Sequence, residues 1–213
     1  MYAADDPLNG RRNLIRRHEF EIARTADKSG IQSQFSEQKY VMLKSLLGPN
    51  SVSLLYNYAV ELANKGNWKG DIQVPNTPGF YADPCMENLL LQLLPMIEEV
   101  SSLKLFPTYS YFRVYKRGDV LTKHSDRPAC EISVSLTLGY DADAAWPLWI
   151  EGPSGTCAAE LERGDALVYR GCECAHWRNT FPGEHHAQVF LHYVDQSGGN
   201  RVWKYDKRPI LRL

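Results

Sequence analysis

The sequence predicts an α+β protein in which helices come first and a β-rich core follows. Residues before about 105 hold the longer amphipathic segments. Residues after it hold short runs of β-branched and aromatic residues separated by Gly, Pro and Asp. Many short strands at this spacing are typical of a β-sandwich or barrel. We therefore expect one domain, with the helices packed on an outer face of the sheets.

Three helices are expected before residue 105. They cover Ser36–Leu47, Ser53–Asn64 and Asp83 to about Ser102. The first two carry apolar residues at helical spacing and end at glycine-containing stop signals. The third opens on an Asp–Pro pair, in which aspartate caps the helix and proline takes its first position. Pro95 is expected to kink or split this helix.

The other segments of the first half are expected to be irregular. Residues 1–30 are charged and weakly patterned, so we expect them to be partly mobile or to lie along the surface. Residues 66–82 are rich in Gly, Pro and Asn and predict a long loop. Loops of this length are often lids or binding loops, and a plain connection is the alternative.

Seven short strands are expected in the second half. They cover Thr108–Lys116, Val120–Thr122, Glu131–Gly139, Trp146–Glu151, Ala166–Tyr169, Ala175–Asn179 and Ala187–Val194. Gly-Asp pairs at 118–119 and 164–165 mark tight turns that open strands. We expect Trp146, Trp149 and Trp177 to serve packing rather than base stacking.

Composition and charge argue against several functional classes. The formal net charge of −1 gives no sign of a nucleic-acid or membrane surface partner. The polar N-terminal stretch lacks the apolar region of a secretory signal, and runs such as Leu89-Leu90-Leu91 are too short to span a bilayer. Five cysteines, an odd number without scaffold spacing, predict reduced thiols and a cytoplasmic location. Cys172 and Cys174 with His176 could suggest zinc, but a closed zinc site needs further ligands at CxxC-like spacing.

His124-Ser125-Asp126, followed by His176, is the strongest chemical signal in the chain. A strand points residues i and i+2 to the same face, so His124 and Asp126 can converge on one metal ion. His176 follows 52 residues after His124 (176 − 124), which leaves room for several strands to return to the same point. Two histidines and one carboxylate form the facial triad of non-haem Fe(II) oxygenases. An isolated HxD pair could equally be two residues of a surface turn. The case for a metal site therefore depends on the residues around His124 and Asp126.

The surrounding pattern resembles the Fe(II)/2-oxoglutarate-dependent oxygenases, on their prolyl-4-hydroxylase-like branch. The matching elements are Tyr115-x-x-Gly118 before the HxD, a Gly-Asp strand opening at 164–165, the distal His176 and a final hydrophobic strand. The resemblance implies a double-stranded β-helix, a jelly-roll or cupin-like barrel, over residues 105–196. Residues 1–104 would then be a helical region packed on its outer face, and residues 197–213 a C-terminal tail.

The resemblance also implies a chemistry. His124, Asp126 and His176 would bind Fe(II), and 2-oxoglutarate and O2 would be consumed to hydroxylate an unactivated C–H bond, forming succinate and CO2. The carboxylate of Asp126 favours hydroxylation over halogenation. The substrate stays open between a peptide or prolyl residue and a small metabolite, with no nucleic acid expected. The Gly66–Tyr81 loop would help to form the substrate mouth.

The last strand departs from the family pattern. Members usually carry Arg or Lys nine or ten residues after the distal His, where it pairs with the far carboxylate of 2-oxoglutarate. Here those positions hold His185 and His186. Counting by twos, His186, Gln188, Phe190 and His192 share one face, which we expect to point inward. His186 is therefore the candidate anchor, although imidazole is a poorer and pH-dependent cation.

Other side chains could complete or replace this anchor. Arg178, two residues after His176, is the substitute cation. Tyr115 could add a phenol hydrogen bond, and Arg113 shares its strand face. Arg127 is expected either to orient Asp126 or to be a solvated charge. His192 is expected to be a satisfied core residue.

The sequence leaves two other functions open. One is a metal-binding, cupin-like module without turnover, which the missing Arg or Lys keeps open. The other is a Zn(II)- or Mn(II)-dependent hydrolase or isomerase on the same barrel, with a metal-bound water.

Overall fold

The computed structural model describes residues 7–23 and 27–213. Its α-helices are α1 (Pro7–Ile15), α2 (Lys28–Gln38), α3 (Pro49–Asn64) and α4 (Pro84–Ser101). Its strands are β1 (Tyr40–Leu43), β2 (Gly79–Tyr81), β3 (Leu105–Lys116), β4 (Leu121–His124), β5 (Ile132–Asp141), β6 (Leu148–Gly152), β7 (Gly155–Ala159), β8 (Ala166–Arg170), β9 (His176–Arg178) and β10 (His185–Asp195). Two 3-10 segments, η1 (Pro128–Cys130) and η2 (Gly199–Lys207), complete the described elements.

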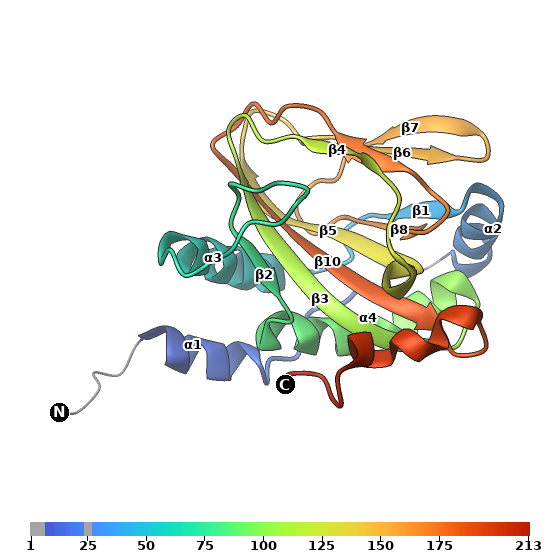
Figure 1. Ribbon diagram of the computed structural model, residues 1–213, viewed down its shortest axis with the longest axis horizontal. Helices are drawn as coiled ribbons and strands as arrows, with labels where there is room; N and C mark the ends of the chain where they lie inside the picture. Colours follow the sequence, from blue (N-terminus) through green and yellow to red (C-terminus); the bar gives the residue numbers. More distant parts are fainter. Residues whose placement is uncertain (1–6, 24–26) are drawn as a thin grey trace.

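The strands form two antiparallel sheets that face each other (Figure 1). The larger sheet has the order β1-β8-β5-β10-β3-β2, and the smaller one has the order β4-β9-β6-β7. The predicted order of helices first and a β-sandwich or barrel second is confirmed. The larger sheet also takes in β1 and β2, which come from residues before 105.

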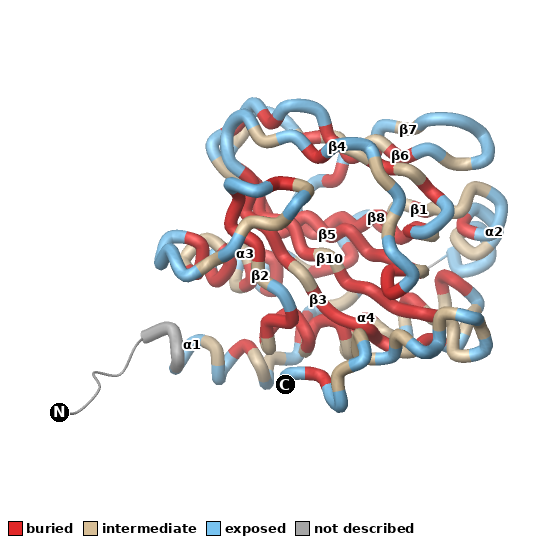
Figure 2. Tube along the Cα trace, in the orientation of Figure 1, coloured by how far each residue is buried: buried red, intermediate tan, exposed pale blue. Residues whose placement is uncertain are grey.

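The helices cover the outer face of the larger sheet, as predicted. Along β5, Val134, Leu136 and Leu138 join the core cluster that contains the apolar sides of α3 and α4. The alternate residues point to the opposite face, toward the smaller sheet. Strands β3, β5 and β10 are therefore largely buried on both sides (Figure 2).

The face of β5 between the two sheets is polar. On β5 it carries Ser133, Ser135 and Thr137, all fully buried. Their partners across β10 are His192, Phe190 and Gln188, respectively. Buried polar groups require hydrogen-bond partners, so this interior is built for specific contacts rather than for apolar packing alone.

The predicted helix Ser36–Leu47 is wrong from Lys39 onward, and only its first three residues are helical. Helix α2 ends at Gln38, and Lys39 adopts a left-handed conformation with φ of 68°. Tyr40–Leu43 then pairs antiparallel with β8 as an edge strand. Alternating burial in this stretch fits a strand as well as a helix turn, and the open edge of β8 decides between them by supplying backbone partners.

The other two predicted helices are confirmed, with changed details. Helix α3 starts at Pro49, earlier than expected, because the proline fits the first turn after Gly48. Asp83 caps α4, accepting hydrogen bonds from the amides of Cys85 at 2.9 Å and Met86 at 3.4 Å. Pro95 lies inside α4 without dividing it.

Several shorter elements differ from expectation. Strands β1, β2 and β7 were not expected, and α1 occupies part of the segment that was expected to be irregular. Residues 1–6 and 24–26, part of that same segment, lie outside the described residues. Within the described part of the chain, no helix is long and apolar enough to cross a membrane.

Candidate metal centre

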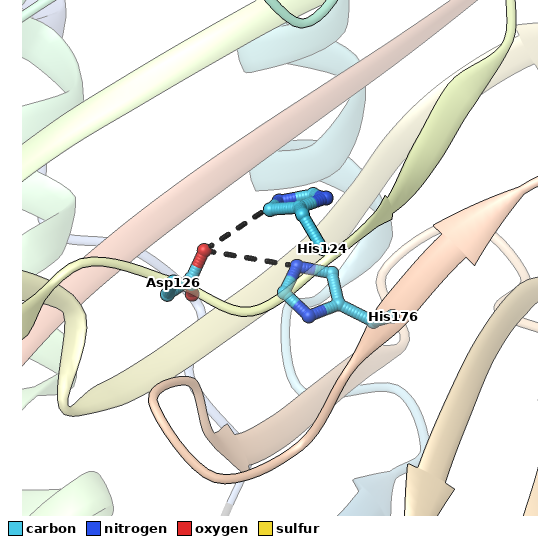
Figure 3. Close-up of side chains that lie close together, drawn as sticks. All are labelled: His124, Asp126 and His176. Atoms are coloured by element: carbon cyan, nitrogen blue, oxygen red, sulfur yellow. Dashed lines mark ion pairs between the residues drawn. The ribbon is translucent and has the colours of Figure 1, made fainter.

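His124, Asp126 and His176 come together between the two sheets (Figure 3). His124 ends β4 and His176 begins β9, and the two are register partners in the smaller sheet. The Nε2 atoms of both imidazoles lie 3.7 Å from Oδ1 of Asp126. The three side chains thus present one ligand atom each to a single point, as the HxD spacing predicts.

Backbone carbonyls orient both imidazoles. Nδ1 of His124 lies 2.8 Å from the carbonyl oxygen of Thr122, and Nδ1 of His176 lies 3.1 Å from that of Cys174. A carbonyl only accepts, so Nδ1 carries the hydrogen in each ring and Nε2 keeps its lone pair for a metal. Burial lowers the pKa of His176, which favours the neutral ligand form. This donor set fits a divalent transition metal.

The carboxylate of Asp126 is held on its other side. Ser133 Oγ lies 2.8 Å from Oδ2, and the Asp126 backbone N–H donates to the carbonyl of Gly171 at 2.9 Å. Sequence reasoning missed Ser133. The signal was present in the alternation of Ser133, Ser135 and Thr137 along an otherwise apolar strand, which marks a polar inward face.

A cavity of about 390 Å³ opens beside the three side chains. Aromatic residues form much of its wall: Tyr81, Tyr109, Tyr111, Tyr169 and Phe190. Its volume suits a small ligand or the reacting end of a larger one.

The loop after α3 reaches this cavity through Asp71. The Asp71 carboxylate pairs with the guanidinium of Arg113 and accepts a hydrogen bond from the hydroxyl of Tyr111 at 2.8 Å. Burial opposes ionisation of Asp71, but the Arg113 charge and the hydrogen bonds outweigh it and lower its pKa. Sequence reasoning missed Asp71, because no local pattern joins it to β3.

Arg127 serves a different contact from either predicted one. Its guanidinium makes two hydrogen bonds to Asp206, at 2.8 and 2.9 Å, and lies over the ring of Tyr109. Arg127 therefore ties the C-terminal segment to the cavity wall instead of orienting Asp126. Asp206 also accepts a hydrogen bond from Tyr81 at 2.6 Å.

His186 lies deep in the barrel and does not line the cavity. Its Nε2 lies 2.7 Å from Oε1 of Gln188, and its ring stacks on Tyr140 and meets the edges of Tyr115 and Trp146. Burial lowers its pKa to about 3. The imidazole is therefore neutral at physiological pH and lacks the charge that a carboxylate anchor needs.

Arg178 is a buried cation of this interior, as is Arg113. It is 1% exposed and donates hydrogen bonds to the carbonyl of Trp146 and, at 3.3 Å, to Oε1 of Gln188. Its Nε has no hydrogen-bond partner, and no carboxylate of the described residues pairs with it. Burial lowers its pKa to about 10. A buried positive charge without a counter-ion is costly and predicts an anionic ligand.

The four predicted cosubstrate contacts thus fall into different places. Arg113 lines the cavity but is already paired with Asp71. Tyr115, Arg178 and His186 lie deeper, with Tyr115 accepting a hydrogen bond from Arg113 at 3.0 Å. Arg178 alone of the four combines a positive charge with the lack of an acidic partner among the described residues.

The zinc alternative receives no support from the described residues. Cys174 Sγ lies 3.7 Å from the carbonyl of Lys39, and Cys172 Sγ lies 3.5 Å from that of Arg127. Over residues 7–23 and 27–213, the groupings able to hold a metal are the His124 triad and a second set of Asp126, Cys130 and His192. All five cysteines are free.

No protein-family model matches the chain, and no curated protein matches it. Solved structures do match. A Pseudomonas putida prolyl-4-hydroxylase is 13% identical with a TM-score of 0.67, over 79% of this chain and 99% of its own. EctD from S. alaskensis is 17% identical with a TM-score of 0.67, over 93% of this chain and 96% of its own.

A third match is the epimerase SnoN in complex with Fe3+, alpha ketoglutarate and nogalamycin RO. It is 11% identical with a TM-score of 0.69, over 85% of this chain and 90% of its own. The chain therefore has the fold of the Fe(II)/2-oxoglutarate-dependent oxygenases, and the predicted double-stranded β-helix is confirmed.

Proposed function

We propose that the protein is an Fe(II)- and 2-oxoglutarate-dependent dioxygenase that hydroxylates an unactivated C–H bond of a small molecule or peptide. The observation that carries this proposal is the convergence of His124, Asp126 and His176 beside a cavity on this fold. Two imidazoles and one carboxylate suit ferrous iron and would leave coordination positions for the cosubstrate and O2.

The residues of the chain divide the work between them. His124, Asp126 and His176 would hold the metal. When bound, iron and 2-oxoglutarate together activate O2 and release succinate and CO2. The aromatic wall of the cavity would exclude water from the reacting carbon. Arg113, through Asp71, would hold the 66–82 loop at the substrate mouth.

Arg178 would anchor the far carboxylate of 2-oxoglutarate. It follows His176 by two residues on the same strand face, about 7 Å further along β9 at ~3.3 Å per residue. That spacing suits a five-carbon dicarboxylate whose other end meets the metal. Tyr169 lies beside this site, since its hydroxyl is 3.4 Å from Nε2 of His176. Tyr115 would add a hydrogen bond, and His186 would form a neutral wall.

The segments of the chain contribute unequally to this proposed site. Residues 105–196 supply the metal and anchor side chains and would form the catalytic core. Residues 1–104 supply the covering helices and two strands, and residues 197–213 supply Asp206 at the cavity rim. The free state of all five cysteines supports a reducing compartment such as the cytoplasm.

Anaerobic titration with Fe(II) and 2-oxoglutarate tests the proposal. The complex is expected to show a weak visible charge-transfer band, and aerobic incubation with substrate is expected to yield succinate. His124→Ala should abolish both signals. His18→Ala, whose side chain lies outside the cavity, is the matched control.

Other outcomes would favour the remaining functions. Tight metal binding without 2-oxoglutarate decarboxylation would indicate a metal-binding module. Zn(II) or Mn(II) retained through both aerobic and anaerobic purification, with no charge-transfer band after Fe(II) loading, would indicate a hydrolase or isomerase. Unchanged turnover in His124→Ala would show that the ligand assignment is wrong.

A further inference from the structure

The two oxygens of the Asp126 carboxylate lie in different surroundings. Oδ1 faces the metal point, 3.7 Å from Nε2 of both His124 and His176. Oδ2 points away from it and lies 2.8 Å from Oγ of Ser133. The carboxylate is thus already divided into a metal-facing atom and a protein-bound atom.

Ser133 has one hydroxyl hydrogen and several neighbours that could accept it. Besides Asp126 Oδ2, they are the carbonyl of Cys130 at 3.1 Å, Nδ1 of His192 at 2.9 Å and the hydroxyl of Tyr169. A hydrogen bond to a charged carboxylate is about twice as strong as a neutral one, so the hydrogen goes to Asp126. Nδ1 of His192 must then donate to Ser133 Oγ, whether the imidazole is neutral or protonated.

The surroundings keep this chain of hydrogen bonds rigid. His192 is 5% exposed, and its ring packs against Tyr109 with centroids 4.6 Å apart. Gly171 closes the Oδ2 side, because a methyl group at its Cα would overlap Asp126 Oδ2, Ser133 Oγ and the carbonyl of Cys130. The carboxylate therefore has little room to rotate both oxygens toward the metal.

We propose that Ser133 and His192 are positioning residues that hold Asp126 as a one-oxygen metal ligand through the relay His192 Nδ1–H to Ser133 Oγ–H to Asp126 Oδ2. The relay rests on the proposed function, because it acts on the metal centre assigned there. Its effect is to prevent Asp126 from chelating the metal with both oxygens. A position is thereby kept open for the cosubstrate or O2. His192, expected from the sequence to be a satisfied core residue, acquires this role through Ser133.

Co(II) binding without cosubstrate tests the relay independently of turnover. Co(II) affinity and its visible spectrum, which reports coordination number, would be measured for Ser133→Ala, His192→Leu and the double variant. Loss of an outer hydrogen-bond partner typically weakens metal affinity about 10- to 100-fold. Since His192 acts through Ser133, the double variant should lose no more affinity than Ser133→Ala alone.

Two controls separate the relay from a packing role. His192→Asn places an amide N–H where Nδ1–H lies, so its Co(II) affinity should stay within about twofold of the wild-type value. His192→Gln places its amide elsewhere and should lose affinity as His192→Leu does. Ser110 lies on the face of β3 that points away from the cavity, and its buried hydroxyl has no hydrogen-bond partner. Ser110→Ala should therefore leave Co(II) binding unchanged. If Ser133→Ala fails to fold, the Asn and Gln pair at position 192 makes the same comparison.

The outcomes distinguish the relay from the metal centre itself. Unchanged Co(II) affinity and spectrum in Ser133→Ala, equal behaviour of His192→Asn and His192→Gln, or additive losses in the double variant would overturn the relay. Failure of the wild-type protein to bind Co(II), or equally tight binding by His124→Ala, would instead overturn the proposed function.

Discussion

Replacing Arg178 with methionine should stabilise the ligand-free protein and weaken its binding of 2-oxoglutarate. Burial lowers the pKa of Arg178 from its ordinary 12.5 to about 10. At about 1.4 kcal/mol per pKa unit, burying this charge costs about 3 kcal/mol. Because the folded-state pKa is the lower one, the cost is fully present below about pH 10 and is relieved only as the pH rises toward 12.5.

The hydrogen bonds lost with Arg178 offset part of the stability gained by removing its buried charge. Methionine fills a similar volume but leaves the carbonyl of Trp146 and Oε1 of Gln188 without the donors of Arg178. At about 1 kcal/mol each, these losses reduce the net stabilisation to about 1 kcal/mol. For a chain of this size, that raises the melting temperature by about 2–4 °C.

In the presence of 2-oxoglutarate, the wild-type protein should be more stable than Arg178→Met. A buried carboxylate–guanidinium pair is worth about 2–5 kcal/mol when one partner is removed, so 2-oxoglutarate affinity should fall about 30-fold or more. With Mn(II) and 2-oxoglutarate at about 100 times the wild-type Kd, wild-type protein gains about 2.7 kcal/mol and Arg178→Met gains about 1 kcal/mol or less. Differential scanning calorimetry with and without ligand measures both effects.

Arg113→Met is the matched comparison for this experiment. Arg113 is also buried, but its removal leaves Asp71 without its cation, so this variant should lose stability without ligand. The reasoning fails if Arg178→Met melts below wild type without ligand and gains as much from 2-oxoglutarate. Loss of 2-oxoglutarate binding in Arg113→Met alone would move the anchor to β3.

Three further predictions concern other parts of the structure. Gly171→Ala should weaken Co(II) binding about 10-fold by displacing Asp126, while Gly10→Ala, with open space around its Cα, should not; equal Co(II) titrations would contradict this. Glu87 is fully buried and binds Arg208 of the C-terminal segment, so Glu87→Ala should lower the free energy of unfolding by about 3 kcal/mol. Urea denaturation measures this loss, and an unchanged midpoint would count against the ion pair. Burial lowers the His186 pKa to about 3, so the unfolded chain takes up this proton first as the pH falls. His186→Gln should therefore reduce the loss of stability between about pH 6.5 and 3. Urea titrations at several pH values would refute this if the variant lost as much stability in that range as the wild-type protein.

The sequence could predict the elements whose signals are local. Alternation of apolar and polar residues located most strands after residue 105, and the Asp83 cap located the start of α4. The stretch from Tyr40 to Leu43 shows where this fails. Four residues with alternating burial do not distinguish a strand from the end of a helix, and only pairing with the distant edge of β8 makes them a strand.

The same division holds within the candidate site. The HxD spacing and a later histidine predicted the three side chains that converge, although β4 ends at His124 and Asp126 lies just beyond the strand. Asp71 carried no local signal, and the alternation along β5 marked Ser133 as inward-facing without indicating its contact with Asp126. Contacts of this kind depend on which segments the fold brings together.

By itself the sequence determined the candidate ligands, the helical and β-rich halves and the inward face of the last strand. Only the tertiary structure decided the charge state of that interior. Packing by Tyr115, Tyr140 and Trp146 makes His186 a neutral imidazole, and burial without an acidic partner among the described residues makes Arg178 the cation that needs an anion. The physical reason is that side-chain direction follows from local strand geometry, whereas the free energy of a buried charge depends on every segment packed around it.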